Sequence, residues 1–537
     1  MSAGEVSTRA GRREWLGLAT LALPTFVVAI DLFVLLLALP KLSMDLGADS
    51  NQQLWTTDMY GFVLAGFLVT MGTLGDRIGR RKLLLIGAAA FGLASLLAAY
   101  SVNPEMLIAA RALLGIAGAT IGPCTLALIA NLFRDPKQQA AAFGLWGMTF
   151  TLGALLGPIL GGVLLEHFWW GSVFLVGVPI MALLLVVGPK LLPEYRNAQA
   201  GRLDPASVVL SLIALLSTIY GIKQLARNGW ETLSVVALVV GVVAGVVFVR
   251  RQRRLAEPLL DLSLFSSRTI GTSLTGQITY TFMSGGVMLS MALYFQLVHG
   301  MSTLQAGLAM VPGMAGAAVG FMVGPKVASR IRPGYVIASG LVIVAAVLVV
   351  LTQVGPGSVG TATLIIGFAV MAFSGAPMAG LGTNLVVGSA PPEKAGSAGS
   401  MAQMANEFGA TLGIALLGTI GAAVYRHQIA DNIPAGIPAD TAAAAHDSIA
   451  GAAAAASSLP DQVGASLLAP AHQAFADGLD TVAGIGAVLI VGIAILVATR
   501  LRHLPPIGQP AAGADQAGLA EVAAEPDAVP VAAQDQA

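Results

Sequence analysis

Charged residues and cysteine are both scarce in this chain. Asp, Glu, Lys and Arg together make up 10% of its 537 residues, whereas hydrophobic residues make up 56%. Soluble domains carry about 25% charged residues, so this composition excludes a water-soluble globule and predicts an all-α membrane protein embedded in the lipid bilayer. The single cysteine, Cys124, excludes an intramolecular disulfide and a cysteine-rich metal site.

Motifs of enzymes and of ATP-driven machines are also missing. The sequence contains no Gly-Lys dipeptide, which excludes a Walker A loop and ATP hydrolysis within this chain. None of its six histidines falls within a predicted span, and none pairs with another at metal-ligand spacing. No nucleophile constellation stands out either. We therefore predict no catalytic residues, no metal site, no cofactor and no nucleic-acid partner.

What the sequence does contain is a series of long apolar runs. Fourteen of them are long enough to cross a bilayer, which takes roughly 20 helical residues. Because the number is even, both termini should lie on the same side of the membrane. The predicted spans are 15–38, 53–74, 83–101, 105–129, 139–165, 173–189, 204–225, 232–249, 272–297, 304–324, 334–353, 359–388, 396–423 and 478–499.

Basic residues indicate which side that is. If the N-terminus is cytoplasmic, 23 of the 28 lysine and arginine residues fall on inner segments, among them the run RRQRR at 250–254. Cytoplasmic segments of membrane proteins carry such an excess. No small-residue cleavage site follows residues 1–14, so we expect the first span to be retained. The sequence predicts a multi-pass protein of the bacterial inner membrane with both termini in the cytoplasm.

The spans define a predicted domain organisation. A cytoplasmic segment (1–14) precedes a six-helix bundle (15–189), an inner linker with two inserted helices (190–271), a second six-helix bundle (272–499) and a cytoplasmic tail (500–537). The loop GTLGDRIGRRK at 72–82 is weakly similar to GPKVASRIRPG at 324–334, which fits duplicated halves. The tail is rich in Ala, Pro and acidic residues, and we predict that it is disordered.

The second bundle contains a long outer loop at 424–477. Its segments 441–458 and 461–476 are compatible with short amphipathic helices, and an irregular Ala-rich loop fits the sequence equally well.

Asp31 is the first candidate functional residue, because it is an acid inside the first span. An acid at the centre of a spanning helix costs about 2.5–3.5 kcal/mol and usually marks a pathway for ions or substrates. Counting back from Ala38 places Asp31 roughly 10 Å below the outer end of its helix. We interpret Asp31 as a group that carries protons and attracts cations. The alternative is an acid that pairs with a basic residue and fixes helix packing.

Arg111, in the fourth span, has about the same predicted depth as Asp31. An unpaired arginine at that depth is costly, so pairing with Asp31 is the least costly arrangement. Arg111 would favour the charged form of the carboxylate, and a cationic substrate near Asp31 would do the same and help to expel its proton. This competition is a physical basis for exchanging protons for organic cations.

Five further polar or aromatic residues complete the predicted site. Glu407, near the middle of the thirteenth span, is a second candidate for proton or cation binding, although a structural hydrogen bond would also explain it. Gln403 lies four residues before it, on the same helix face. Asp58 is either a coupling group or a solvated acid at a helix start. Tyr60 and Trp146 offer aromatic faces to a cation.

Two glycine-containing motifs have more specific spacing. In the loop between spans 2 and 3, glycines make a tight turn, and Asp76 can pair with the following arginines or with a neighbouring helix, which would hold one conformation. In span 5, glycines four residues apart share a face for close helix contact, and a proline is expected to kink the helix. The loop motif comprises Gly72, Gly75, Asp76, Arg77, Gly79, Arg80 and Arg81, and the span-5 motif comprises Gly153, Gly157, Pro158, Gly161 and Gly162.

These stretches together resemble a known family. IDLFVLLLALP, GTLGDRIGRRK, RALLGIAGA and GALLGPILGG are similar to the signature motifs of the major facilitator superfamily. The fourteen spans, the segment EPLLDLSLF (257–265) and the long outer loop resemble its 14-helix drug:proton antiporters, in particular bacterial pumps for quaternary ammonium compounds, dyes, methyl viologen and fluoroquinolones. The resemblance implies two six-helix bundles plus two inserted helices.

The resemblance also implies roles and a function. Asp31 would be the proton-coupling and cation-binding acid, Asp58 and Arg111 would belong to the coupling machinery, and Glu407 would match an acid found in span 13 of related pumps. The segment 310–320 lacks the acid of relatives that export divalent cations. We expect a monomeric antiporter that is driven by the proton gradient and exports cationic or amphipathic small molecules. The alternatives are an exporter of a natural metabolite or siderophore and a non-transporting membrane sensor.

Overall fold

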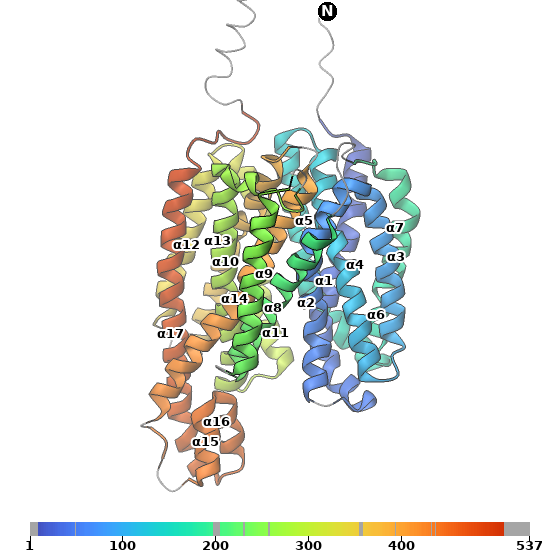
Figure 1. Ribbon diagram of the computed structural model, residues 1–537. Coiled ribbons are helices and arrows are strands. Elements are labelled where there is room, and N and C mark those ends of the chain that lie inside the picture. Colours follow the sequence, from blue (N-terminus) through green and yellow to red (C-terminus); the bar gives the residue numbers. More distant parts are fainter. Residues whose placement is uncertain are drawn as a thin grey trace, which may run out of the picture.

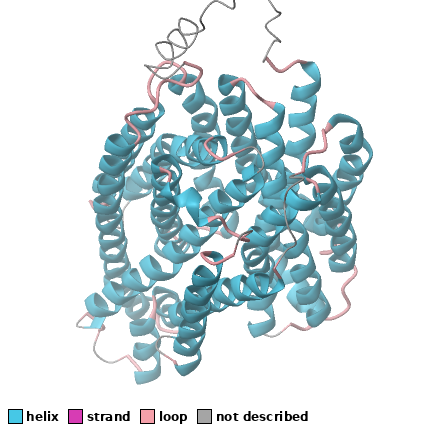
Figure 2. Ribbon diagram, turned by 45° about the horizontal axis from the view of Figure 1, so that its top comes forward, coloured by secondary structure: helices cyan, strands magenta, loops and turns pink. Residues whose placement is uncertain are grey.

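The computed structural model describes residues 9–48, 50–196, 204–228, 231–255, 258–353, 358–391, 394–430, 432–434 and 437–509. Helices make up nearly all of these residues, and no strand forms among them (Figures 1 and 2). Fourteen of the described helices are long and apolar enough to cross a membrane. The predicted all-α membrane fold with fourteen spans is therefore confirmed.

The helices follow one another in two sets separated by an inserted pair. We call the face on which the first helix begins the inner face. The first set contains α1 (Arg12–Leu46), α2 (Ser50–Ile78), α3 (Arg80–Ala99), α4 (Pro104–Leu132), α5 (Pro136–His167), α6 (Ser172–Leu175) and α7 (Gly177–Leu191); the insertion contains α8 (Pro205–Asn228) and α9 (Thr232–Gln252). The second set contains η1 (Leu262–Ser266), α10 (Arg268–Leu293), η2 (Tyr294–Val298), α11 (Thr303–Ala328), α12 (Pro333–Leu351), α13 (Ser358–Gly388), α14 (Ala395–Ala430), α15 (Ala439–Asp447), α16 (Ile449–Ser457) and α17 (Asp461–Arg500).

Local sequence explains where several of these helices begin. The side chain of Asn103 accepts a hydrogen bond from the Met106 backbone N–H at the start of α4. Asp135 does the same for α5 with two backbone N–H groups, and a proline follows each of these caps. Ser302 opens α11 with a reciprocal capping box that includes Gln305. Such caps satisfy backbone donors that have no partner within the helix.

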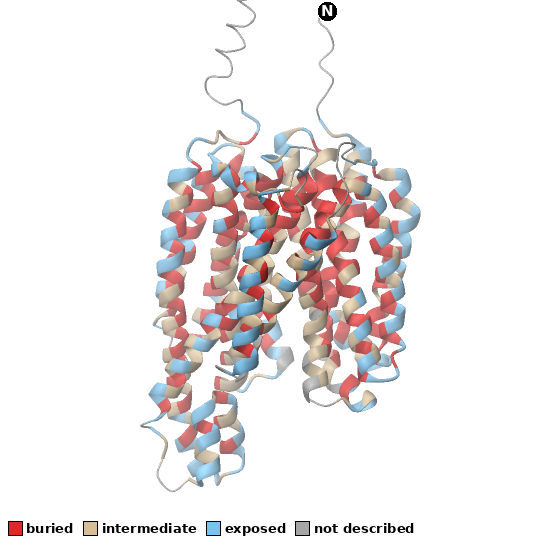
Figure 3. Ribbon diagram, viewed as in Figure 1, coloured by how far each residue is buried: buried red, intermediate tan, exposed pale blue. Residues whose placement is uncertain are grey.

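Each set of helices has its own apolar core. One cluster of buried side chains joins α1 to α7, and a second cluster joins α10 to α17. Buried residues lie between the helices, and exposed residues lie along their outer sides (Figure 3). The outward side chains include many large apolar residues, such as Val239, Val242 and Val246 on α9. Such a surface is stable only against lipid.

Several predicted boundaries were wrong. α1 continues through Pro40 to Leu46, so Asp31 lies about 22 Å from the outer end of its helix rather than 10 Å. The segment 461–476, for which a short helix was one of two alternatives, is the first part of α17, which is continuous to Arg500. Residues 501–509 pack on the inner face, where the Ile507 N–H donates to the Ala328 carbonyl oxygen at 2.8 Å. The predicted disorder therefore does not apply to 501–509, and 510–537 lies outside the described residues.

The outer loop 424–477 is helical over most of its described part. α14 extends into it as far as Ala430, and the short helices α15 and α16 follow; α15 packs on α16 and α14, and α16 packs on α17 (Figure 1). The Tyr425 hydroxyl donates to the Ala445 carbonyl oxygen at 2.8 Å and ties the two short helices to α14. Of the two alternatives that the sequence left open, the helical one holds for the described residues.

The inserted helices lie along the contact between the two sets. α8 packs on both α2 and α14, and α9 packs on α8. Leu212 and Leu216 of α8 pack against Gly66 of α2, where a side chain would collide with them. Near the other end of α8, the ring of Tyr220 stacks on Trp55 with centroids 6.0 Å apart. The insertion thus contacts a helix of each half.

Glycine permits the closest helix contact in the second half, between α10 and α14. A Cβ atom at Gly413 would overlap the carbonyl oxygen of Phe282, and one at Gly409 would lie 2.6 Å from the carbonyl oxygen of Ile278. Backbone atoms cannot move away as a side chain can. This contact therefore requires glycine on α14.

We expect Gly413→Ala to lower the free energy of unfolding by about 1–3 kcal/mol, because the added methyl group overpacks a backbone contact. Gly492→Ala is the matched control, since nothing lies within 4 Å of a Cβ atom there. Melting temperatures in detergent, measured by the loss of the monodisperse chromatographic peak on heating, compare the two. Equal melting temperatures for both variants would contradict the packing argument.

Candidate functional site

An ion pair between α1 and α4 lies in the core of the first half. Arg111 Nη1 lies 2.6 Å from Asp31 Oδ2, and the two residues are 1% and 6% exposed. Arg111 Nε also donates to the carbonyl oxygen of Thr56 on α2 at 3.2 Å. The pairing predicted from the sequence is therefore present. It compensates two charges that would each be costly if buried alone.

Tyr60 of α2 covers this ion pair. Arg111 Cζ lies 4.6 Å from the centre of the Tyr60 ring, within cation–π range. Tyr60 is fully buried, and its hydroxyl makes no hydrogen bond with any described residue. Gly115 and Gly118 of α4 make room for it, since a Cβ atom at Gly118 would lie 3.1 Å from the hydroxyl oxygen. In this conformation the ring faces Arg111, and its predicted contact with substrate stays a prediction.

The space beside Asp31 is small. Its carboxylate adjoins a cavity of about 10 Å³ that is lined by Phe91, Phe174 and Gly177, among others. A cavity of roughly 10–15 Å³ is the smallest that holds one water molecule. This cavity is too small for an organic cation.

Glu407 lies on α14, in the other half of the molecule. It is partly exposed, and its carboxylate makes no ion pair or hydrogen bond with a described residue. Asp31, Arg111 and Glu407 all lie within electrostatic range of the Tyr60 hydroxyl. Glu407 therefore faces the contact between the halves rather than lipid.

Other polar atoms of α14 accompany Glu407. Gln403 Oε1 and Asn406 Oδ1 are buried and accept no hydrogen bond from a described residue. Gln403 lies directly against Gly122 of α4, where a Cβ atom would overlap its amide. Buried acceptors without partners are rare in folded proteins and need an explanation. A ligand donor or water between the halves would satisfy them.

Two further residues of the predicted site, Trp146 and Asp58, lie on α5 and α2. Trp146 Nε1 of α5 donates to Thr125 Oγ1 of α4 at 3.1 Å, so its indole is oriented within the first half. Asp58 lies on α2 two residues before Tyr60, which places the two side chains about 200° apart around the helix. Asp58 is therefore directed away from the Tyr60 side. The roles of both residues stay predictions.

Asp76 joins the two halves at the inner face. Its Oδ2 accepts from the Ser397 backbone N–H at 2.9 Å and its Oδ1 from that of Gly396 at 3.2 Å, both in the first turn of α14. Arg80 Nε donates to Oδ1 at 2.8 Å from the start of α3. A carboxylate at a helix N-terminus is stabilised by the free N–H groups and the helix dipole. Both partners predicted for Asp76, the arginine and a neighbouring helix, are used together.

The halves also meet closely around this contact. Gly72 packs directly against Ser400 of α14, because a Cβ atom on Gly72 would lie 2.6 Å from Ser400 Cβ. On the other side of the molecule, a Cβ atom at Gly144 of α5 would overlap the carbonyl oxygen of Phe321 of α11. Close packing on both sides closes the inner face in this conformation.

The turn between α2 and α3 depends on Gly79. Its φ of 112° lies in a region that side chains rarely allow, and a Cβ atom would meet the Glu194 carboxylate at 2.7 Å. Glu194 accepts from the backbone N–H groups of Arg81 and Lys82 and so caps α3. Arg80 Cζ lies 4.8 Å from the ring centre of Tyr195. The segment after α7 thus holds the turn in place.

The remaining members of the loop motif lie around this turn. Gly75 lies on α2, where a Cβ atom would come 3.2 Å from the Cys124 sulfur of α4. Arg77 ends α2, and Arg81 pairs with Glu194 at 3.6 Å and donates to the Leu192 carbonyl oxygen at 3.0 Å.

The glycines of α5 face α1. A Cβ atom at Gly153 would lie 2.7 Å from the Phe26 carbonyl oxygen, and one at Gly161 would lie 2.6 Å from a Val34 methyl group. Gly157, between them, is buried, whereas nothing lies within 4 Å of a Cβ atom at Gly162. The side chain of Pro158 lies outside those described. These glycines hold α5 against the helix that carries Asp31.

Several polar residues that the fold pairs or buries were not singled out by any sequence pattern. Asp480 is an acid inside the last apolar span, and its Oδ1 is buried without a hydrogen-bond partner among the described residues. It is the third residue of the predicted span 478–499, whereas the rule applied to Asp31 concerns acids near the centre of a span. Glu194, Thr73 and Lys394 lie at or near helix ends, where polar residues are common.

Comparison with known proteins finds related sequences and a related structure. A sequence model described as Major Facilitator Superfamily matches residues 21–414. The chain is 40% identical over 499 residues to the multidrug efflux pump LfrA of Mycolicibacterium smegmatis, covering 93% of this chain and 98% of that one. It is 38% identical over 471 residues to the methyl viologen resistance protein SmvA of Salmonella typhimurium, covering 86% and 93%. The crystal structure of the human organic anion transporter MFSD10 shares the fold, with a TM-score of 0.61 at 15% identity over 90% of this chain and 99% of that one.

We expect Tyr60→Phe to keep the melting temperature of the protein, because the hydroxyl has no described partner and the ring stays over Arg111. Tyr60→Leu should lower the free energy of unfolding by at least the cation–π contribution, about 0.5–2 kcal/mol. Thermal unfolding of the purified variants in detergent checks both. If Tyr60→Phe were destabilised as much as Tyr60→Leu, the hydroxyl rather than the ring would be the stabilising group.

Proposed function

Because the chain belongs to the major facilitator superfamily, we propose that this multidrug efflux transporter is a proton-driven antiporter that exports lipophilic organic cations. Quaternary ammonium compounds, dyes and fluoroquinolones are the proposed substrates. Members of this family are transporters and not enzymes. The names of the relatives LfrA and SmvA describe multidrug efflux and resistance to methyl viologen, which is an organic cation. The proposed location is the bacterial inner membrane, with both termini in the cytoplasm and a monomer as the working unit.

The observation that carries this proposal is the buried pair of Asp31 and Arg111 in a membrane-spanning half. Arg111 cannot lose its proton, so Asp31 is the member of the pair that changes charge. The cavity beside Asp31 admits a water and excludes a drug molecule. We therefore assign proton binding to Asp31. Taking up a proton there weakens the ion pair, which alters the contact of α1 with α4.

Glu407 is the better candidate for contact with the cation. It is partly exposed and lies at the contact between the halves, together with the acceptors of Gln403 and Asn406. A cation there would gain charge and hydrogen-bond acceptors that the described residues leave unused. Both acids lie within electrostatic range of the Tyr60 hydroxyl. In the proposed cycle, binding of a cation at Glu407 and binding of a proton at Asp31 exclude each other.

We expect Asp31→Asn to abolish the pH dependence of efflux, because the amide cannot exchange a proton. The measurement is uptake of ethidium into everted membrane vesicles, with the imposed proton gradient varied and with a protonophore as reference. Asp45→Asn, an exposed acid near the outer end of the same helix, should transport normally. Wild-type pH dependence in Asp31→Asn would defeat the assignment of proton coupling to Asp31.

For Glu407→Gln we expect the KM for a permanently charged cation to rise about tenfold or more, because the amide lacks the negative charge that attracts the cation and about 1.4 kcal/mol of lost attraction corresponds to tenfold. Glu407→Asp keeps the charge and should retain most of the affinity. Initial rates of ethidium transport at several concentrations give KM for each variant. In the same vesicles, inhibition by a neutral metabolite but not by a quaternary ammonium compound would favour the alternative of a metabolite or siderophore exporter.

A further inference from the structure

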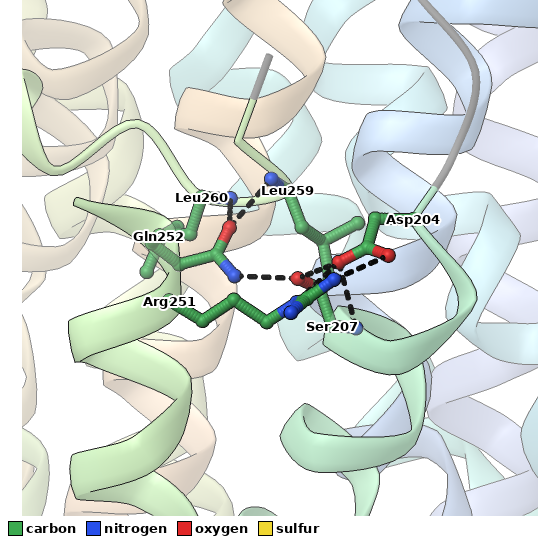
Figure 4. A network of polar contacts seen from close by, with 6 residues as sticks. All are labelled: Asp204, Ser207, Arg251, Gln252, Leu259 and Leu260. Carbon is green, nitrogen blue, oxygen red and sulfur yellow. Dashed lines mark hydrogen bonds and ion pairs between the residues drawn. The ribbon is translucent and has the colours of Figure 1, made fainter. Parts of the chain in front are cut away.

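Residues 258–266, which we call the inner strap, cross the inner face between α9 and α10. Gln252, the last residue of α9, holds the strap with its side chain. Gln252 Oε1 accepts from the backbone N–H of Leu259 at 2.6 Å and from that of Leu260 at 3.3 Å (Figure 4). Two amide donors on one carbonyl oxygen fix the position of the strap relative to the insertion.

The glutamine is itself anchored between the inserted helices. Gln252 is 3% exposed, and its Nε2 donates to Ser207 Oγ of α8 at 2.8 Å. Ser207 Oγ donates to Asp204, whose carboxylate receives two hydrogen bonds from Arg251 at 2.6 and 3.0 Å (Figure 4). These hydrogen bonds, above all those from Arg251, hold the pKa of Asp204 below its usual range, so it stays charged. The insertion therefore supports the strap through a fully connected polar network.

The strap also contacts both halves of the molecule, at α2 and at the start of α14, the two helices that Asp76 joins. Thr73, one turn before Asp76 on α2, donates through Oγ1 to the Leu259 carbonyl oxygen at 2.7 Å. Lys394, directly before α14, pairs with Asp261 of the strap. Burial raises the pKa of Asp261, but hydrogen bonds from Lys394 and Ser263 outweigh this effect and keep the pKa low. A second connection between α2 and α14 thus runs through the strap, in parallel with Asp76.

Apolar side chains of the strap also pack between α2 and α14. Leu259, Leu260 and Leu264 of the strap are buried in one cluster with residues of α2, α9, α10, α13 and α14. The cluster includes Val69 of α2 and Met401 of α14. Opening of the inner face separates α2 from α14, so the strap cannot follow both helices.

We propose that the inner strap is a series latch across the inner face, positioned by the inserted helices, and that it sets how often the inner side opens. The latch rests on the proposed transport cycle only in that the inner side must open. Its two links, Thr73 with Leu259 and Asp261 with Lys394, connect one after the other between α2 and α14. Opening therefore breaks the weaker link and leaves the other intact. The Lys394 side chain is 45% exposed, so the ion pair is the weaker one.

Two links that act one after the other predict a result that two independent links do not. Removing either link, or both, should raise the ratio of inward-open to inward-closed protein by the same factor, about two- to fivefold, which is the value of an exposed ion pair. If the two links acted independently, the factors measured for the two single variants would instead multiply in the double variant. The variants are Thr73→Val, which keeps the shape of the side chain, Lys394→Gln, and the two combined.

The readout is the rate at which N-ethylmaleimide labels Ser400→Cys in protein with Cys124→Ala, reconstituted in nanodiscs without substrate. Ser400 is fully buried against Gly72, so its labelling requires α2 and α14 to separate. Thr70→Val is the matched control, because the Thr70 hydroxyl on the same helix has no described partner. Lys326→Gln, which removes another exposed inner lysine, controls for charge, and Lys394→Arg should label like wild type.

Spin labels at Lys82→Cys and Arg330→Cys, exposed inner residues of the two halves, measure the same opening as a distance. Equal increases in labelling rate and in the long-distance population for both single variants and the double variant support the latch. Rates equal to those of Thr70→Val, or a double variant that multiplies the two single effects, would overturn it. Both readouts are independent of transport, so a failed drug-efflux assay and a failed latch are distinguishable.

Discussion

The cost of placing a charge in a lipid-surrounded core governs this molecule. Arg111 keeps its proton at any physiological pH, so the first half tolerates it only with Asp31 at hydrogen-bond distance and Tyr60 over its guanidinium group. α1 must then run close to α4, and the glycines of α5 and α4 allow that closeness. A proton on Asp31 removes the negative charge that balances Arg111, so a single protonation event directly affects the packing of α1 on α4.

The inner face is closed by a different kind of interaction. Asp76 is held by backbone N–H groups of the first turn of α14 and by Arg80, so the contact between the halves depends on where a helix starts rather than on a matching side chain. A helix terminus can release a carboxylate without leaving a buried side-chain charge of its own. This makes the contact suitable for repeated breaking and forming.

Much of the fold followed from the sequence because lipid imposes a strict length and polarity on each span. The cost of burying a charge paired Asp31 with Arg111 in advance, whereas Asp480, near the end of its predicted span, did not stand out. The partners of Asp76 on α14 could not be identified in advance, since backbone N–H groups are common to every sequence. The extension of α1 past Pro40 and the continuity of α17 from Asp461 were hidden because polar residues near the ends of spans read as loops. The strap was visible as EPLLDLSLF, but its partner Thr73 lies 186 residues away from Leu259 on another helix, and no sequence pattern marked Gln252, seven residues before Leu259, as a partner.

In the proposed exchange of protons for organic cations, Asp31 and Glu407 take different roles because they lie in different surroundings. Asp31 adjoins a space for one water within the first half, whereas Glu407 faces the contact between the halves from the second. A single carboxylate that bound both ligands would need a cavity open to drug molecules, and the cavity at Asp31 is too small for that. Two separate acids avoid that requirement, with Asp31 in the first half and Glu407 in the second, both within electrostatic range of Tyr60. In the proposed mechanism the proton and the organic cation then need no direct contact, so substrates of varied shape would share one proton site.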